Sequence, residues 1–187
     1  MQLDPTSGWC HDVRHCPSPN FNERPHGEIS LLVIHNISLP PRQFATGQVQ
    51  RFFQNQLDPA EHPFFETIKA LRVSAHFLIE RDGQVTQFVS CLDRAWHAGI
   101  SSFEGRETCN DFSIGIELEG TDDQPFCDAQ YQALIALTRE LQTHYGDITL
   151  QRICGHSDVA PGRKTDPGPH FDWTRYRSAL QHRGDNQ

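Results

Sequence analysis

The sequence predicts an α/β fold, in which one mixed β-sheet is flanked by helices within a single domain. Short runs of branched apolar residues, as at 29–36, are typical of buried central strands. Segments with helical periodicity, as at 128–145, alternate with such runs. The 187 residues fit one domain, since domains commonly span about 100–200 residues. We expect this domain to cover residues 1–187, with an irregular arm over about residues 1–28.

The first predicted strand, at 29–36, places His35 at its carboxyl end. Ligands of α/β proteins collect at that edge of the sheet. Apolar residues then recur at helical spacing and predict a short helix at 48–57, with a second short helix around 65–70.

A β-hairpin is predicted next. Two runs of strand-forming residues, 74–81 and 84–89, are joined by Asp82-Gly83, which is a strong signal for a tight turn between antiparallel strands. Residues 90–111 show no periodicity and hold Trp, His, Arg and several Gly and Ser residues. We expect a long functional loop there.

The clearest strand is 112–119, where apolar and polar residues alternate and Glu117 lies on the polar side. Asp128 is expected to cap a long helix, because Asp side chains accept hydrogen bonds from free N–H groups of the first turn. A short strand at 151–155 and a last helix capped by Asp172 complete the pattern.

The composition argues against nucleic acid or an anionic membrane as the main partner. The formal net charge is −8 and no run of Lys and Arg occurs, whereas such binders usually carry basic patches. No signal peptide is evident, and no stretch approaches the roughly 20 apolar residues of a membrane span. The six cysteines are scattered, without a C-x-x-C pair, which favours reduced thiols in a cytoplasmic protein.

The segment 155–169 is the expected centre of the site. It holds three Gly and three Pro residues together with His156, Lys164 and Asp166. Because Gly and Pro interrupt regular structure, we expect a stiff loop. Functional residues are often held in such loops by a rigid scaffold.

His35, His156 and Asp166 are candidate metal ligands. Two His and one Asp match the three protein ligands of a catalytic zinc, whose fourth position is left to water. Hydrolysis also needs a base and a group that stabilises an oxyanion. Glu117 is the candidate base. Lys164 lies two residues before Asp166, which places both side chains on one side of an extended segment, so its ammonium would lie near the metal.

Two carboxylates compete with these assignments. Asp158 could replace Asp166 as a ligand, although an H-x-D pair also forms a turn in which the Asp caps the backbone. Glu119 shares a strand face with Glu117 and could be the base in its place.

Other polar residues near these motifs have structural interpretations. Cys154 is expected to be a buried, inert thiol, although it could ligate a metal. His76 is expected to play a structural role, with a possible hydrogen bond close to the site. His97 could be a ligand, but its segment fits a substrate wall better, and Trp96 would offer a sugar its large apolar face.

Four segments resemble the zinc-dependent N-acetylmuramoyl-L-alanine amidases, in the order in which that family carries them. They are 32–41 (LVIHNISLPP), 94–99 (RAWHAG), 109–120 (CNDFSIGIELEG) and 155–168 (GHSDVAPGRKTDPG). The similarity extends over about residues 8–180, nearly the whole chain. It implies a fold shared with peptidoglycan recognition proteins and phage amidases.

The resemblance implies that His35, His156 and Asp166 bind Zn²⁺ and that Glu117 and Lys164 are catalytic. Segments similar to the family's substrate-contacting parts contain Asn36, Arg72, Trp96 and Arg106. Position 108 is Thr where some relatives carry Arg, which leaves a stem-peptide contact there open.

The implied reaction is cleavage of the amide between the lactyl group of anhydro-N-acetylmuramic acid and L-Ala of the stem peptide. This reaction would serve peptidoglycan recycling and, through muropeptide levels, β-lactamase induction. The expected partner is a small soluble anhydromuropeptide, not nucleic acid or a membrane, with the chain acting as a cytoplasmic monomer. The alternatives are a binding module that holds peptidoglycan fragments without cutting them and an amidase that acts on the polymeric wall.

Overall fold

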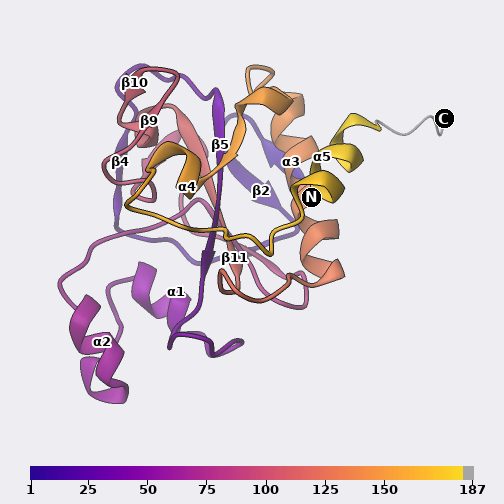
Figure 1. Cartoon of the computed structure of the whole chain (residues 1–187). Coiled ribbons are helices and arrows are strands. Elements are labelled where there is room, and N and C mark those ends of the chain that lie inside the picture. Colours follow the sequence, from indigo (N-terminus) through magenta and orange to yellow (C-terminus); the bar gives the residue numbers. More distant parts are fainter. Residues whose placement is uncertain (183–187) are drawn as a thin grey trace.

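The computed structural model describes residues 1–182 and shows a mixed β-sheet with helices on both faces (Figure 1). Residues 183–187, which the predicted domain includes, lie outside the described part. The six strands of this sheet follow the order β12-β5-β11-β6-β7-β3. Their bounds are β3 Arg14–His15, β5 Leu31–Ile37, β6 Phe77–Ile79, β7 Val85–Gln87, β11 Ser113–Glu119 and β12 Ile153–Gly155. The predicted fold class is confirmed.

Strands β5 and β11 pair parallel to each other at the centre of the sheet. The branched apolar residues of these strands favour that buried position. Every residue of β11 is buried, as are the first five of β5, so both faces of these strands are covered by other elements. Their register places His35 opposite Glu117. On the same face, Val33 pairs with Gly115. Two candidate site residues therefore lie side by side near the carboxyl ends of the strands.

Two long helices cover the face of the sheet opposite to the one that carries His35 and Glu117. Helix α3 is Asp128–His144 and α5 is Trp173–Gln181, and both lie together beside the strands in Figure 1. Leu134, Leu137 and Tyr176 from these helices pack against Ile34 and Ile116 of the central strands. This large apolar cluster holds the sheet in place and leaves the opposite face to the site.

The site-bearing face is covered by smaller elements. Helix α4, His156–Val159, packs its Val159 against Val33 and Cys154. The other short helices are α1 Gln48–Phe53, α2 Pro63–Ile68, η1 Pro59–Glu61, η2 Cys109–Asp111 and η3 Leu150–Arg152. Helices α1 and α2 lie near each other at one end of the molecule (Figure 1) and build a second apolar cluster around Phe53 and Phe65.

The prediction of an irregular arm over residues 1–28 was wrong in part. Strands β1 Gln2–Asp4 and β2 Trp9–His11 form a small sheet, β3 joins the main sheet, and β4 Phe21–Glu23 pairs with β8 Asp93–Ala95. Strands of two or three residues are too short for alternation to reveal them, and their partners are distant in sequence. The expected loop 90–111 likewise contains β8, η2 and the β9–β10 pair, Ser102–Phe103 and Arg106–Glu107.

Other local predictions can be compared directly. The Asp82-Gly83 hairpin is confirmed, since β6 and β7 pair antiparallel across it. Asp172 caps α5 by accepting from the Arg175 N–H at 2.9 Å. The N-cap of α3 is Cys127 rather than Asp128, which is the first helical residue. The expected loop at 155–169 begins with α4. In residues 1–182, no helix combines the length and the apolar character that crossing a membrane requires.

Candidate metal centre and active site

Three side chains from separate elements converge at the carboxyl edge of the central strands. His35 lies in β5, His156 is the first residue of α4, and Asp166 follows in the connection to α5. His35 Nδ1 lies 3.0 Å from His156 Nδ1 and 3.2 Å from Asp166 Oδ2. His156 Nδ1 lies 3.0 Å from the same Asp166 oxygen. The three predicted ligands thus present one atom each to a common point.

The backbone explains how these residues meet. Strand β12 runs parallel to β5 and ends at Gly155, opposite Ile34, so the next residue, His156, emerges beside His35. The Ser157 N–H donates to the Asp166 carbonyl at 2.9 Å, which ties the segment after α4 back to the start of that helix. A sheet register and one backbone hydrogen bond therefore set the arrangement.

The protonation states of the cluster suit a metal site. Burial lowers the pKa of His35 to about 4, which favours the neutral imidazole. Burial alone would raise the pKa of Asp166, but hydrogen bonds with His156 and His35 hold it below its ordinary value. Neutral imidazole and ionised carboxylate are the forms in which these side chains bind metals.

Glu117 lies next to this cluster. Unlike the three clustered side chains, its carboxyl group makes few hydrogen bonds. Its side chain is buried, and its Oε2 has no hydrogen-bond partner among the described residues. Burial raises the pKa of Glu117 well above the usual value, the Asp166 carboxylate adds to this, and Lys164 opposes it. A carboxyl with a raised pKa is suited to exchange protons near neutral pH.

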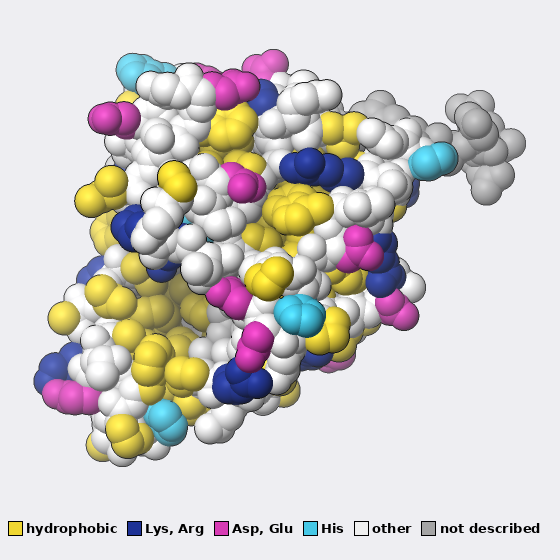
Figure 2. Space-filling model, in the orientation of Figure 1, with side chains coloured by type: hydrophobic (Ala, Val, Ile, Leu, Met, Phe, Trp, Pro, Cys, Tyr) yellow, Lys and Arg dark blue, Asp and Glu magenta, His cyan; other side chains and the backbone are white. Residues whose placement is uncertain are grey.

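A cavity of about 220 Å³ lies beside this cluster. Part of its wall is apolar and comes mainly from α1 and the segments that precede β6 and follow β8: Ile37, Phe52, Phe53, Leu71, Val73 and Trp96. The rest of the wall is polar and contains Asn36, Ser74, His97, Glu117, His156, Lys164 and Asp166. Figure 2 shows hydrophobic side chains gathered around a hollow beside the region of α1 and α2. A ligand with one apolar and one polar side would match this cavity.

Two of the four predicted substrate-binding residues lie at the cavity and two do not. Asn36 and Trp96 line the cavity. Arg72 does not, and its Nη1 donates to the carbonyls of Lys69 and Leu71 at 3.0 and 2.9 Å. Arg106 lines a different depression, where it pairs with Glu28 at 2.6 Å.

The competing carboxylates have other partners. Asp158 Oδ2 accepts from the Gly155 N–H at 2.8 Å and so caps α4. Glu119 accepts from the N–H groups of Ala45 and Arg81, at 2.6 and 3.3 Å. The cluster of possible ligands in residues 1–182 contains neither of them. Cys154 packs among apolar side chains, and burial raises the pKa of its thiol.

Sequence reasoning missed the surroundings of the two histidines. His97 lines the cavity, as expected for a substrate wall, and its Nδ1 also lies 2.9 Å from His35 Nε2. The carbonyl of Ala98 lies 3.1 Å from His156 Nε2. One signal could have pointed to His97: Gly115, on the strand face of Glu117, has no side chain and leaves room for a large neighbour.

Comparison with known proteins defines the class. The chain belongs to the N-acetylmuramoyl-L-alanine amidase family, whose model matches residues 25–169. The predicted enzyme class is thereby confirmed.

The relatives are more specific. The 1,6-anhydro-N-acetylmuramyl-L-alanine amidase AmpD of Haemophilus influenzae is 56% identical over 179 residues, which cover 95% of this chain and 97% of that protein. A crystal structure of a selenomethionine AmpD derivative superposes with a TM-score of 0.93 at 53% identity, covering 96% of this chain and 99% of that one. Escherichia coli AmiD in complex with the substrate anhydro-N-acetylmuramic acid-L-Ala-D-γ-Glu-L-Lys matches with a TM-score of 0.60 at 32% identity, over 81% of this chain and 57% of AmiD. The predicted resemblance to N-acetylmuramoyl-L-alanine amidases is confirmed, and the AmpD enzymes are the relatives that share nearly the whole chain.

Proposed function

We propose that this amidase is zinc-dependent and cleaves the amide between the lactyl group of anhydro-N-acetylmuramic acid and L-Ala of the stem peptide. The observation that carries the proposal is the cluster of His35, His156 and Asp166. Two of its members line one cavity together with Glu117 and Lys164. The AmpD relatives are named for this reaction, and the AmiD complex holds an anhydromuropeptide as its substrate.

The donor set fits zinc. Two imidazole nitrogens and one carboxylate oxygen are typical of catalytic zinc, and ligands about 2.0–2.1 Å from a tetrahedral ion lie roughly 3.3 Å apart. The separations of 3.0 to 3.2 Å among these three atoms are close to that value. Their lone pairs face one another, an arrangement that a cation stabilises. When bound, zinc would polarise the scissile carbonyl and lower the pKa of a water ligand.

The chain's own residues would then share the work of hydrolysis. Glu117 takes a proton from the attacking water at its unpartnered Oε2 and passes it to the leaving amine. Lys164, on the same cavity wall, stabilises the negative charge that develops on the carbonyl oxygen. Asn36 and Trp96 contact the substrate, with the indole offering an apolar surface to the sugar.

The chain is expected to act alone on a small soluble substrate in the cytoplasm. Its net charge of −8 disfavours nucleic acid and anionic membranes. Cys10, Cys91, Cys109 and Cys154 are free and buried, and free thiols are common in reducing compartments. Removing peptides from anhydromuropeptides serves wall recycling and, by lowering muropeptide levels, would restrain β-lactamase induction.

The proposal is tested by metal content and activity measured on the same preparation. A chelator should abolish peptide release from anhydromuramyl-tripeptide, and stoichiometric zinc should restore it. Full activity in a metal-free preparation would contradict zinc dependence. Tight binding without any product would favour the fragment-binding alternative.

The substrate is tested separately by comparing free anhydromuramyl-tripeptide with intact sacculi at equal enzyme concentration. We expect strong preference for the free compound. Faster release from sacculi would favour an amidase of the polymeric wall.

A further inference from the structure

We infer that the segment His97-Ala98 is the device that orients both histidine ligands, with His97 as a positioning residue for His35 and the Ala98 carbonyl as the corresponding partner of His156. The inference deepens the proposed function, since it rests on His35 and His156 binding the metal. It assigns to this segment a role in addition to lining the cavity.

The first half of the arrangement concerns His35. Its Nδ1 faces the ligand cluster, so the opposite ring nitrogen, Nε2, carries the proton when the imidazole is a neutral ligand. That nitrogen lies 2.9 Å from His97 Nδ1. His97 must then accept at Nδ1 and carry its own proton on Nε2, which lies 3.2 Å from Ser113 Oγ. The chain of hydrogen bonds has one consistent direction, from His35 through His97 to Ser113.

The second half concerns His156 and uses the next residue. His156 also turns Nδ1 toward the cluster, and its Nε2 lies 3.1 Å from the Ala98 carbonyl. A carbonyl can only accept, so it selects the ring form with the proton on Nε2. The same carbonyl accepts from Arg163 Nη2 at 2.5 Å. The Ala98 carbonyl therefore selects this tautomer of His156, and the adjacent His97 can accept from the same tautomer of His35.

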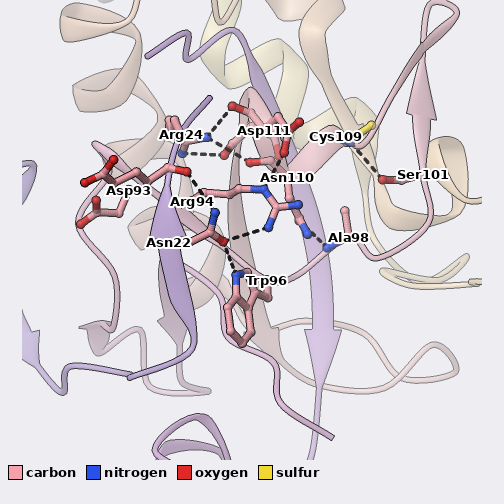
Figure 3. Close-up of polar contacts among 12 residues, drawn as sticks. Asn22, Arg24, Asp93, Arg94, Trp96, Ala98, Ser101, Cys109, Asn110 and Asp111 are labelled. Atoms are coloured by element: carbon pink, nitrogen blue, oxygen red, sulfur yellow. Dashed lines mark hydrogen bonds and ion pairs between the residues drawn. The ribbon is translucent and has the colours of Figure 1, made fainter. Parts of the chain in front are cut away.

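The buried side-chain amide of Asn110 holds the backbone of His97 and Ala98 in place. Asn110 Oδ1 accepts from the N–H groups of His97 and Ala98, at 3.2 and 2.8 Å (Figure 3). Asn110 is itself buried in η2. Its single oxygen holds two consecutive N–H groups, so the two partners of the ligands cannot shift independently.

The sheet face beneath His97 is shaped to receive its ring. A Cβ on Gly115 would lie 2.4 Å from His97 Cγ, far inside van der Waals contact. Only glycine at that position leaves the ring in place. The ring of His97 also packs against two other histidines, since its centre lies 5.0 Å from that of His35 and 5.7 Å from that of His76.

Outer partners of this kind fix the ring orientation and raise the basicity of a metal-bound histidine, and removing one typically costs about 10–100-fold in metal affinity. We therefore expect H97F, which keeps an aromatic ring but offers no acceptor, to weaken zinc binding by about that factor. Chelator competition measures the affinity, and the d–d spectrum of the cobalt-substituted protein reports the ligand geometry. H97N keeps an acceptor near the Nδ1 position and should recover most of the loss.

The matched control is His76, which is also buried but accepts the Gly115 N–H on its Nδ1 at 3.0 Å, while its Nε2 faces Arg24 and the Asp93 carbonyl rather than His35. H76F should lower the unfolding temperature of the chelated protein and leave zinc affinity unchanged. Wild-type affinity and cobalt spectrum in H97F would overturn the inference. So would an H97N variant that binds zinc as weakly as H97F, because His97 would then act by packing alone. If the wild-type protein binds no zinc, the proposed function fails first.

Discussion

Glu117 and Glu119 are two residues apart on β11, yet their carboxylates have different surroundings. Glu119 accepts two backbone N–H bonds, from Ala45 and Arg81, and so connects β11 to two neighbouring segments. Glu117 lines the cavity, and its Oε2 has no hydrogen-bond partner within residues 1–182. An unsatisfied buried oxygen costs stability, and retaining it makes sense where the oxygen must handle a proton.

We predict that E117Q lowers kcat by about 10²–10⁴, the usual contribution of a general acid–base group. Zinc content should stay at the wild-type level, because Glu117 does not contact the ligand atoms. E119Q is the matched control and should lower the unfolding temperature with little change in kcat. The assignment is wrong if E119Q is the inactive variant.

Lys164 belongs to the same cavity wall and can be tested in the same way. K164M keeps the aliphatic stem and removes the charge, so kcat should fall by about 10²–10³, as for other lost oxyanion donors. Metal content and the unfolding temperature should change little, since the side chain is exposed. Loss of zinc from K164M would show instead that Lys164 supports the metal site.

At the scale of elements, local patterns predicted the elements that have long periodic sequences. The alternation around Glu117 and the branched apolar run before His35 identified β11 and β5. The same run placed His35 near the carboxyl end of its strand, which is the edge of the sheet where the three candidate ligands meet. The contact between His97 and His35 was not predicted, because the two residues lie 62 positions apart in the sequence. Gly115 indicates room for a large neighbour on β11 but does not say which residue fills it. No local pattern encodes which side of a loop residue will meet a strand.

The close packing of His97 against Gly115 of β11 can be tested by substitution. G115A would place a Cβ 2.4 Å from His97 Cγ, and overpacking of this kind costs about 1–3 kcal/mol. Urea unfolding of the chelated protein measures the loss. G146A is the control, since a Cβ there would meet nothing within 4 Å, and exposed substitutions usually stay within about 0.5 kcal/mol. Equal stabilities of the two variants would contradict the described packing.

At the scale of the whole molecule, the N-terminal residues are an integral part of the fold. Arg24 follows β4 and is buried. Its guanidinium donates to the carbonyls of Cys91, Asn110 and Ser113, between 2.8 and 3.2 Å. Figure 3 shows Arg24 beside Asn110 and Asp111. A single buried arginine leaves no periodic signal, so the sequence predicted an irregular arm here. Arg24 joins the start of the chain to β11 and to Asn110, which binds the backbone of His97.

We predict that R24M destabilises the protein by about 2–5 kcal/mol, because several buried carbonyls lose their donor at about 1–3 kcal/mol each. Urea unfolding provides the measurement. The control is R42M, whose partner Asp123 is exposed and whose ion pair should contribute only about 0–1 kcal/mol. A loss in R24M no larger than that in R42M would show that these carbonyls find other donors.

The position of Trp96 has a consequence for engineering. Trp96 lines the cavity, and its backbone exchanges hydrogen bonds with Ser74, at 3.0 Å to the Ser74 hydroxyl and 3.1 Å from the Ser74 N–H. The next two residues contact both histidine ligands. A redesign that enlarges the cavity at Trp96 to admit a bulkier sugar therefore acts on the same short peptide that holds the imidazoles. Substrate selectivity and the placement of the two imidazoles would have to be optimised together. Phe52 and Leu71 also line the apolar part of the cavity but belong to other segments, so substitutions there would change its size without acting on this peptide.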